Sequence, residues 1–311
     1  QSVDSSLLLN SLRSFLFASN VQIIDQDLLS TFESSDFVTL TTSDFTVKAT
    51  HSVIAAGVFS DQLIRKINID TSALVPCYSG VGSALLLSSE LDYIQDPLSE
   101  NIVRTPNRGG TCGVHVVQRH DCLYVGASSM TTADFPKKPR AESIDTLLKG
   151  FSSTFQHPLT GLSMSCVTGY RPTSLDTYPI VGPISKHVYA IYGTKRDGLT
   201  WSPLIADSFA SISDDKPQAS NFLKQLSQQY SPFRRPISFG THDHACSSYL
   251  DSKVAEALQH GVILDHNQRQ SLLDSVTSLH ANLPHDFSVH PELVNIFAYN
   301  TNHLNHLKSL V

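Results

Sequence analysis

The sequence has no apolar run approaching the roughly 18 residues that a membrane-spanning helix requires, so no segment is expected to cross a bilayer. It also has no basic run. Its 22 Lys and Arg residues against 28 Asp and Glu give a net charge of −6, which argues against a nucleic-acid-binding surface. Charged residues make up only 16% of the chain, below the roughly one quarter of an average soluble protein.

Cysteine is scarce as well. There are 5 cysteines, without the close pairs that mark a zinc site, and an odd number cannot form a complete set of internal disulfides. We therefore expect a reducing compartment and a cytoplasmic location. The chain begins at Gln1 without a signal-peptide pattern, so it is either processed or its natural start lies elsewhere.

The length and composition suit a large core. A chain of 311 residues with 41% hydrophobic residues can form one large domain or two ordinary ones. Helical and strand patterns alternate along it, which indicates a mixed α+β or α/β fold. The patterns that predict helices are Ser5–Ala18, Ser143–Phe155, Ser202–Ser213, Tyr249–His260, Asn267–Ala281 and Pro291–Leu310, and Ser143 can cap the second of them. The patterns that predict strands are Val21–Ile24, Phe37–Thr42, Thr46–Ala49, His51–Ala56 and Val188–Tyr192, of which the second and third form a hairpin. A turn is expected at Asn107–Gly110, and a further hairpin around R-H-D at residues 119–121.

The most informative stretch runs from Gly169 to Pro203. It contains two arginines beside residues that bend or stiffen the backbone. Pro172 restricts Arg171 to extended geometry, and Gly198 lets the backbone near Arg196 pass close to a flat ligand.

The histidine-rich end of the chain, from Ile237 onwards, forms a separate helical pattern. Within it, H-D-H-A-C would place His242, His244 and Cys246 on one face of a strand, as in a metal site. A solvated polar tail is the alternative reading, and we expect no metal. The helices of this region form a small addition that packs on the main body or on a partner chain.

Four motifs in order resemble the FAD-dependent amino-acid and amine oxidases, the group of D-amino-acid, glycine and sarcosine oxidases. They are V-I-A-A-G-V-F-S from Val53, V-H-V-V-Q-R-x-D-x-L-Y-V-G-A-S from Val114, G-Y-R-P-x-x-x-D-x-x-P-I-V-G from Gly169, and R-D-G-L-x-x-x-P from Arg196. The resemblance covers about Ser5 to Ser213. It implies a partial flavin-binding domain (1–70 and 165–236), an antiparallel-sheet substrate domain (71–164) and a helical C-terminal extension (237–311).

The resemblance implies that Arg171 binds the carboxylate of an amino-acid substrate with its guanidinium fork. The alternative is a structural turn in which Asp176 pairs with Arg171. It also places His115 where relatives have a side chain facing the substrate. A histidine in the core or at a sheet edge is the alternative there.

For the FAD cofactor, the resemblance implies contacts by Arg196 and by the backbone N–H groups of Gly198, Leu199 and Thr200. An exposed turn residue is the alternative for Arg196. The small residues Ala55, Ala56 and Gly57, at the end of a strand, would pass near the same cofactor. A tightly packed turn is the alternative for them.

One part of the family pattern is not found. S-G-V-G-S-A-L has Gly80 and Gly82 but carries Leu85 at the third glycine of a dinucleotide fingerprint, so we reject that reading. Ser79 stands where relatives have a basic residue. The N-terminal unit with G-x-G-x-x-G, which holds the FAD pyrophosphate, is absent from the sequence.

Three explanations account for that absence. The chain is one part of a split or processed oxidase that pairs with a second chain, or it belongs to a longer protein, or it has lost the cofactor. The leading functional hypothesis is an FAD-dependent oxidoreductase, or one chain of it, that oxidises the C–N bond of an amino acid or amine to an imine by hydride transfer. The alternative is a non-catalytic scaffold or interaction subunit on a degenerate oxidase fold.

Overall fold

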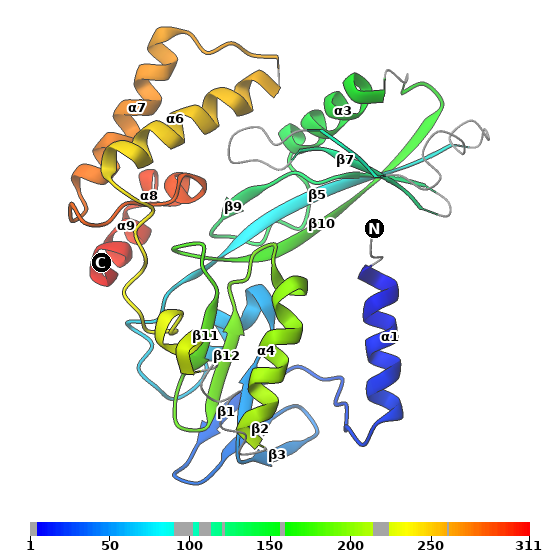
Figure 1. The fold of residues 1–311 in the computed structure, drawn as a ribbon, viewed down its shortest axis with the longest axis vertical. Helices are drawn as coiled ribbons and strands as arrows, with labels where there is room; N and C mark the ends of the chain where they lie inside the picture. The colour runs from blue at the N-terminus through cyan, green and yellow to red at the C-terminus, as the bar shows by residue number, and fades with distance from the viewer. Residues whose placement is uncertain are drawn as a thin grey trace.

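The computed structural model describes residues 5–89, 102–105, 113–119, 122–155, 159–213, 224–259 and 261–311. Within these ranges the chain forms three sheets and a set of helices in an elongated arrangement (Figure 1). Antiparallel and parallel pairings both occur, which confirms the predicted mixed fold class. None of the described helices is long and apolar enough to cross a membrane.

The first sheet is a small antiparallel meander of β1 (Ser30–Glu33), β2 (Val38–Thr41) and β3 (Thr46–Ala49). The predicted hairpin is confirmed, because β2 and β3 pair and the N–H of Thr42 donates to the carbonyl of Phe45 across the turn. The predicted strand at Val21–Ile24 is wrong. These residues are not in a strand, and Val21 is half exposed, so its apolar side chain packs into no sheet.

The second sheet joins three short strands from distant parts of the chain. β4 (Ser52–Ile54) runs parallel to β12 (Val188–Tyr192), and β11 (Ile180–Pro183) pairs antiparallel with the other edge of β12. The prediction for β12 is confirmed to the residue. After β4 the chain continues into η1 (Gly57–Phe59) and α2 (Ser60–Ile64).

The third sheet is built on two long strands, β5 (Cys77–Ser89) and β10 (Leu162–Ser174), which pair along their whole length. The other edge of β5 pairs with β8 (Leu123–Gly126) and β9 (Met130–Thr132). Beyond β8 the sheet adds β7 (His115–Gln118), which pairs with β8, and then β6 (Val103–Arg104), which pairs with β7. The predicted hairpin around residues 119–121 is present as β7 and β8, although His120 and Asp121 themselves lie outside the described residues. The turn predicted at 107–110 also lies outside them.

Helix α3 (Ala141–Phe155) covers one face of this third sheet. Its Leu147 and Phe151 pack with alternate strand residues into a separate core, completed by Leu85, Leu87, Val116, Leu123 and Val125. The prediction that Ser143 caps this helix is wrong, because the helix begins at Ala141 and Ser143 lies buried in its first turn. The opposite face of the sheet is therefore left for other contacts.

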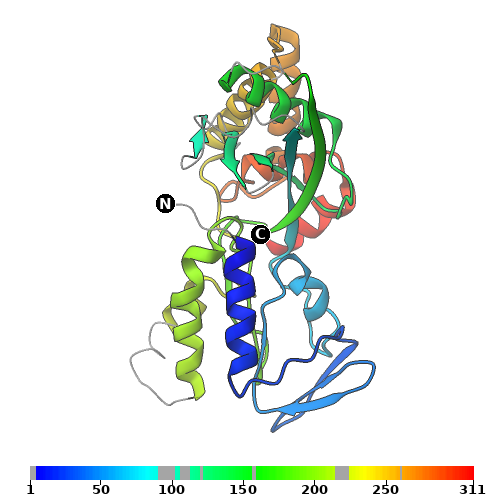
Figure 2. The same cartoon turned by 90° about the vertical axis from the view of Figure 1, so that its right-hand side faces the viewer.

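Two further helices lie in the lower half of the molecule, α1 (Ser5–Ala18) and α4 (Gly198–Ser213), and α1 stands apart from the sheets at the right of Figure 1 (Figures 1 and 2). The predicted α1 is confirmed as a helix, but it has no buried residue. Several of its apolar side chains, Phe15 and Phe17 among them, are more than half exposed.

The C-terminal region is helical as predicted and consists of α6 (His242–Gln259), α7 (His266–Ala281), η3 (Pro291–Leu293), α8 (Val294–Ala298) and α9 (Thr301–Leu310). The single helix predicted over Pro291–Leu310 is interrupted, because Asn300 caps α9 by accepting from the N–H groups of Asn302 and His303. The region packs on the body of this chain and shares a core with β11 and β12 through residues such as Phe297.

The predicted strand with His242, His244 and Cys246 is wrong, because these residues start α6. A helix separates positions two apart, so only His242 and Cys246 share a face. Both approach His280 of α7: the two imidazole rings lie 5.1 Å apart, and Cys246 Sγ is 3.7 Å from His280 Nδ1. His244 stacks instead on Phe239. The described residues contain no group of three or more potential metal ligands.

We expect the C-terminal helices to lose stability in mild acid through His280. Its buried ring donates from Nδ1 to the carbonyl of Val276 at 2.9 Å and accepts at Nε2 from the N–H of Val289 at 3.1 Å, so both nitrogens are used by the neutral form. Burial lowers the pKa of His280, and burial also lowers the pKa of His290 to about 4. The neutral forms contribute stability above the unfolded pKa of about 6.5, and this contribution is lost as pH falls from there.

Thermal melts of the full chain between pH 7.5 and 5 measure this loss. His280→Gln is expected to melt lower at pH 7.5 and to flatten the pH dependence. The exposed His285 provides the matched control, since His285→Gln is expected to keep the pH profile of the parent chain. A melting temperature that stays constant over this range would contradict the assignment.

Candidate active site on the open face of the long-stranded sheet

The face of the third sheet opposite α3 brings together Arg171 and His115, which are far apart in sequence. Arg171 of β10 lies opposite Gly80 of β5. Because every second residue of a strand points to the same face, Gly82 and Ala84 of β5 lie on the same face as Gly80 and Arg171. Ala84 pairs with Gly126 of β8, and Gly126 pairs with His115 of β7. Arg171 and His115 therefore point to one face, and the positions between them are glycine or alanine.

The guanidinium of Arg171 lies directly over Gly82 of β5. A Cβ atom at Gly82 would fall on the guanidinium nitrogens, and Arg171 Nη1 donates to the carbonyl of Ser128 at 3.4 Å. The alternative pairing with Asp176 does not form, because Asp176 binds Arg234 instead. Arg171 is therefore aimed across β5 toward the loop that follows β8.

Gly82→Ala is expected to displace the Arg171 guanidinium without unfolding the sheet, since the atoms that the new methyl group meets are the end of a flexible side chain. Alanine also costs less conformational entropy than glycine in a strand. We expect an unchanged or slightly higher melting temperature and about ten-fold weaker binding of acetate, the loss of roughly one charge-assisted hydrogen bond. The shift of the Arg171 Nε–Hε NMR signal on titration measures this binding.

Gly169→Ala supplies the matched control for this experiment. Gly169 lies opposite Gly82 in the register, but a Cβ there would meet no atom within 4 Å. Equal effects of the two substitutions on acetate binding would argue against a specific role for the space at Gly82.

Arg196 reaches the same loop as Arg171. Its Nη2 donates to Ser129 Oγ at 2.9 Å, and Ser129 follows the Ser128 that Arg171 contacts. The backbones also meet, because the N–H of Lys195 donates to the carbonyl of Pro172 at 2.9 Å. The side chain of Arg196 is exposed, as the alternative reading proposed, yet its guanidinium converges with that of Arg171.

The residues predicted to contact the cofactor lie at one edge of the second sheet. β4 and β12 are parallel, with Ile54 opposite Ala190, so both strands end at the same edge. Ala55, Ala56 and Gly57 follow β4 there, and the segment from Gly193 to Gly198 follows β12. Gly57 has a positive φ of 58° and a Cβ would meet nothing within 4 Å, so this turn is open rather than tightly packed. The carboxyl ends of parallel strands are where α/β sheets bind ligands.

Gly198, Leu199 and Thr200 form the first turn of α4, which begins four residues before the predicted Ser202. Its early N–H groups have no partner within the helix and carry the positive end of the helix dipole. The helix continues through Pro203 because the hydroxyl of Ser202 donates to the carbonyl of Leu199 at 3.0 Å, which replaces the missing backbone N–H. Leu199 and Thr200 are exposed at this end.

His115 is partly buried, and its ring lies 5.7 Å from that of Tyr124 on the same sheet face. Burial lowers the pKa of His115, and the charges of Arg104 and Arg171 lower it further. A hydrogen bond with the backbone of Gly113 acts in the opposite direction. The ring is consequently neutral near pH 7 and stands within electrostatic range of Arg171.

The sequence reading missed Ser128 and Ser129, which join the two arginines. The loop is fixed by two hydrogen bonds to β5, since the N–H of Ser128 donates to the carbonyl of Ser83 and the N–H of Ser83 donates to Ser128 Oγ, each at 2.9 Å. The motif that begins at Val114 ends at Ser128, so it includes that serine without a role and stops before Ser129. The role of Gly82, a glycine rejected as part of a dinucleotide fingerprint, follows from the strand register.

A family model described as "DAO: FAD dependent oxidoreductase" matches residues 1–212. The chain is 23% identical over 199 residues to a glycine oxidase of Bacillus licheniformis, which covers 63% of this chain and 50% of that protein.

Solved structures share the fold. The iminodiacetate oxidase of Chelativorans sp. BNC1 matches with a TM-score of 0.56 and 17% identity, over 69% of this chain and 56% of that one. The glycine oxidase of Bacillus cereus ATCC 14579 matches with a TM-score of 0.55 and 18% identity, over 70% and 56%. This chain thus spans about half the length of the proteins it resembles, and identities this low support the fold alone.

Proposed function

We propose that this chain, which belongs to the DAO family of FAD-dependent oxidoreductases, takes part in oxidising the C–N bond of an amino acid or related amine to an imine. FAD is the cofactor of the family and would supply the acceptor for the hydride that leaves the substrate α-carbon. The observation that carries the proposal is the convergence of Arg171 and Arg196 on the consecutive residues Ser128 and Ser129.

In this proposal Arg171 binds the substrate carboxylate. Its guanidinium has five N–H donors in a planar fork, and it lies over Gly82 on the open face of the sheet. On the same face the ring of Tyr124 lies over Gly126, the residue that pairs with His115. A substrate anchored at Arg171 would extend past the Tyr124 ring toward His115.

His115 would orient the substrate amine. The ring is neutral near pH 7 because burial lowers its pKa, so one of its nitrogens can accept a hydrogen bond from the amine. Arg196 is the second positive charge of the site and contacts the loop after β8 at Ser129. It would contribute positive potential to both the substrate carboxylate and the flavin.

The residues at the edge of the second sheet fit the flavin end of FAD. The open turn at Gly57 leaves space for a planar ring, and the first turn of α4, from Gly198 to Thr200, directs N–H groups and the positive helix end toward it. We propose that Ala55, Ala56 and Gly57 line the cofactor from one side and the α4 segment from the other. The ranges 1–70 with 165–236, 71–164, and 237–311 remain our proposed division into domains.

We further propose that a second chain supplies a dinucleotide-binding unit and that the assembly is cytoplasmic. This chain spans about half the length of its relatives and has no G-x-G-x-x-G. β4 pairs on only one side with a described strand, and α1 carries exposed apolar side chains such as Leu12, Phe15 and Phe17. An unpaired strand edge and an exposed apolar helix are each a surface on which a further β-α-β unit can pack.

The test is to tag the full chain in its source cells, purify it, and record the flavin absorbance of the product and its bleaching on anaerobic addition of glycine. We expect flavin in a complex of two chains, bleached by an amino-acid or amine substrate. Flavin bound by this chain alone would remove the need for a second chain. A protein that binds no FAD, alone or in its complex, would overturn the oxidase proposal and leave an interaction subunit.

A further inference from the structure

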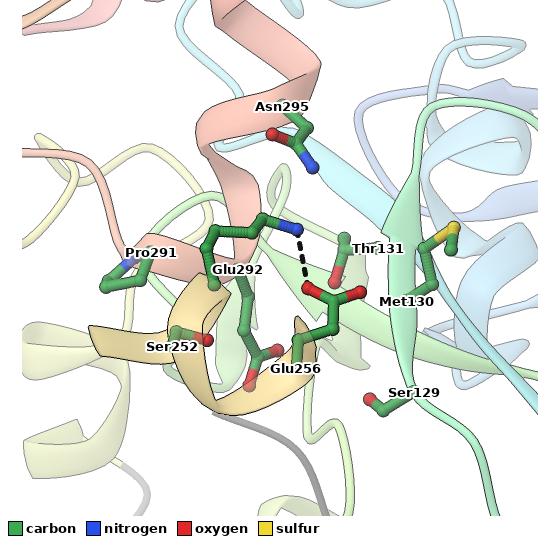
Figure 3. A pocket seen from close by; sticks show the side chains of 9 residues that line it. Ser129, Met130, Thr131, Ser252, Glu256, Pro291, Glu292 and Asn295 are labelled. Atoms are coloured by element: carbon green, nitrogen blue, oxygen red, sulfur yellow. Dashed lines mark hydrogen bonds and ion pairs between the residues drawn. The ribbon is translucent and has the colours of Figure 1, made fainter. Parts of the chain in front are cut away.

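A separate small cavity lies where the C-terminal helices meet the third sheet (Figure 3). Its volume is about 70 Å³, which is room for a few water molecules or a small organic ligand and not for a dinucleotide. The polar side chains that line it come from three parts of the chain: Ser129 and Thr131 at β9, Ser252, Lys253 and Glu256 on α6, and Glu292 and Asn295 at η3 and α8. Most of these residues lie beyond the 1–212 segment that matches the family.

The cavity contains charges of both signs with unused bonding capacity. Lys253 Nζ pairs with Glu256 Oε2 at 2.7 Å, and Glu292 Oε2 pairs with Lys195 Nζ at 2.7 Å. Each carboxylate thus uses one oxygen, and its Oε1 bonds to no residue that the structure describes. Lys253 likewise keeps two ammonium N–H donors beyond its pair with Glu256.

Asn295 adds a donor of fixed orientation. Its Oδ1 accepts from the hydroxyl of Tyr249 at 2.9 Å, so its Nδ2 amide group is directed away from that bond. Figure 3 shows this nitrogen on the side of the residue that faces the other lining side chains, with the Glu256 carboxylate among them. The cavity therefore offers both carboxylate acceptors and N–H donors, with the Lys253 ammonium next to the Glu256 carboxylate.

This pattern matches one chemical class of ligand. A lone anion would face two carboxylates, and a lone cation would leave the donors of Lys253 and Asn295 unused. A metal ion is a poor match, because both carboxylates already pair with lysines and the described residues contain no group of three metal ligands. A small molecule with both an ammonium and a carboxylate group satisfies both sets.

We propose that this cavity is a binding site for a small zwitterionic amino acid, distinct from the site at Arg171. The ligand ammonium binds Glu256 and Glu292, and its carboxylate binds Lys253 and Asn295. Ser129 lines the cavity and also accepts a hydrogen bond from Arg196, so the two sites share one residue.

The experiment is an NMR titration of the full chain with three probes, glycine, methylammonium and acetate, following the backbone signals of residues 252–256 and 292–295. We expect glycine to bind at least about ten-fold more tightly than either probe of single charge, since each charged end adds hydrogen bonds worth more than ~1.4 kcal/mol. Glycine that shifts none of these signals, or that binds no better than methylammonium, would overturn the proposal.

Two variants and two controls sharpen this test. Glu256→Gln is expected to weaken glycine binding about ten-fold, and Asn295→Asp, which keeps the acceptor for Tyr249 but opposes the ligand carboxylate, is expected to do the same. Glu142→Gln removes an exposed ion pair with Arg140, just before α3 and remote from the cavity lining, and is expected to change nothing. If Arg171→Lys abolished glycine binding while Glu256→Gln did not, the ligand would occupy the proposed substrate site only and this second site would be rejected.

Discussion

Asp176→Asn is expected to lower the free energy of unfolding by about 3–5 kcal/mol, because it leaves the guanidinium of Arg234 buried without its counter-charge. The carboxylate of Asp176 is 0% exposed and the Arg234 side chain 7%. Arg234 donates to both carboxylate oxygens, from Nε at 2.8 Å and from Nη2 at 2.7 Å. The N–H groups of Tyr178 and Ile237 donate to the same carboxylate.

The loss of stability should extend to the C-terminal helices. Ile237 begins the segment that leads to α6, and its N–H donates to the Asp176 carboxylate. Chemical denaturation of the variant measures the loss of unfolding free energy. Following it separately by circular dichroism of the helices and by the fluorescence of Trp201 shows whether the C-terminal helices unfold together with the rest of the chain. The neighbouring pair of Arg235 and Asp286 is the matched control, because those side chains are 52% and 63% exposed. Asp286→Asn is expected to leave the stability unchanged, and equal losses in the two variants would contradict the account.

Arg171→Ala is expected to raise the KM for an amino-acid substrate roughly 100-fold in the FAD-loaded protein, while the melting temperature stays within about a degree of the parent. The size follows from two hydrogen bonds between charged groups at the lower end of their net range of about 1.5–3 kcal/mol each, since about 1.4 kcal/mol corresponds to a factor of ten. Glycine is the first probe, measured in steady-state kinetics beside a thermal melt of each variant.

Two further arginine variants separate the carboxylate contact from general effects of charge. Arg171→Lys keeps the charge but not the planar fork, so we expect an intermediate KM. Arg140→Ala removes an exposed arginine on the other side of the sheet and is expected to have no effect. An unchanged KM in Arg171→Ala would remove Arg171 from the substrate site and with it the main support for the proposed reaction.

Local patterns predicted much of the secondary structure. The alternation in Val188–Tyr192 predicted β12, and the spacing of apolar residues predicted α1, α3 and α7, because these signals depend only on the residues within each element. Short apolar segments were less reliable. Val21–Ile24 has the composition of a strand, but a strand requires a partner, and the sequence does not show whether one is present.

The histidines of α6 illustrate a second limit. H-D-H-A-C alternates as a strand does, but these residues form the start of α6. The helix begins at His242, seven residues before the expected start at Tyr249. Packing of α6 against α7 decides this, since His242 and Cys246 meet the buried ring of His280 from one helical face. Such a contact between positions more than 30 residues apart leaves no local signal.

By itself, the sequence determined the resemblance to flavin-dependent oxidases, the mixed fold class and the two arginines, because motifs and periodicity are written in neighbouring residues. The tertiary structure decided which partners those arginines take. Strand register placed Gly82 beneath Arg171, the loop after β8 joined Arg171 to Arg196, and the buried carboxylate of Asp176 went to Arg234. Register and side-chain pairing are set by contacts across the fold, so they became visible only once distant strands were brought together.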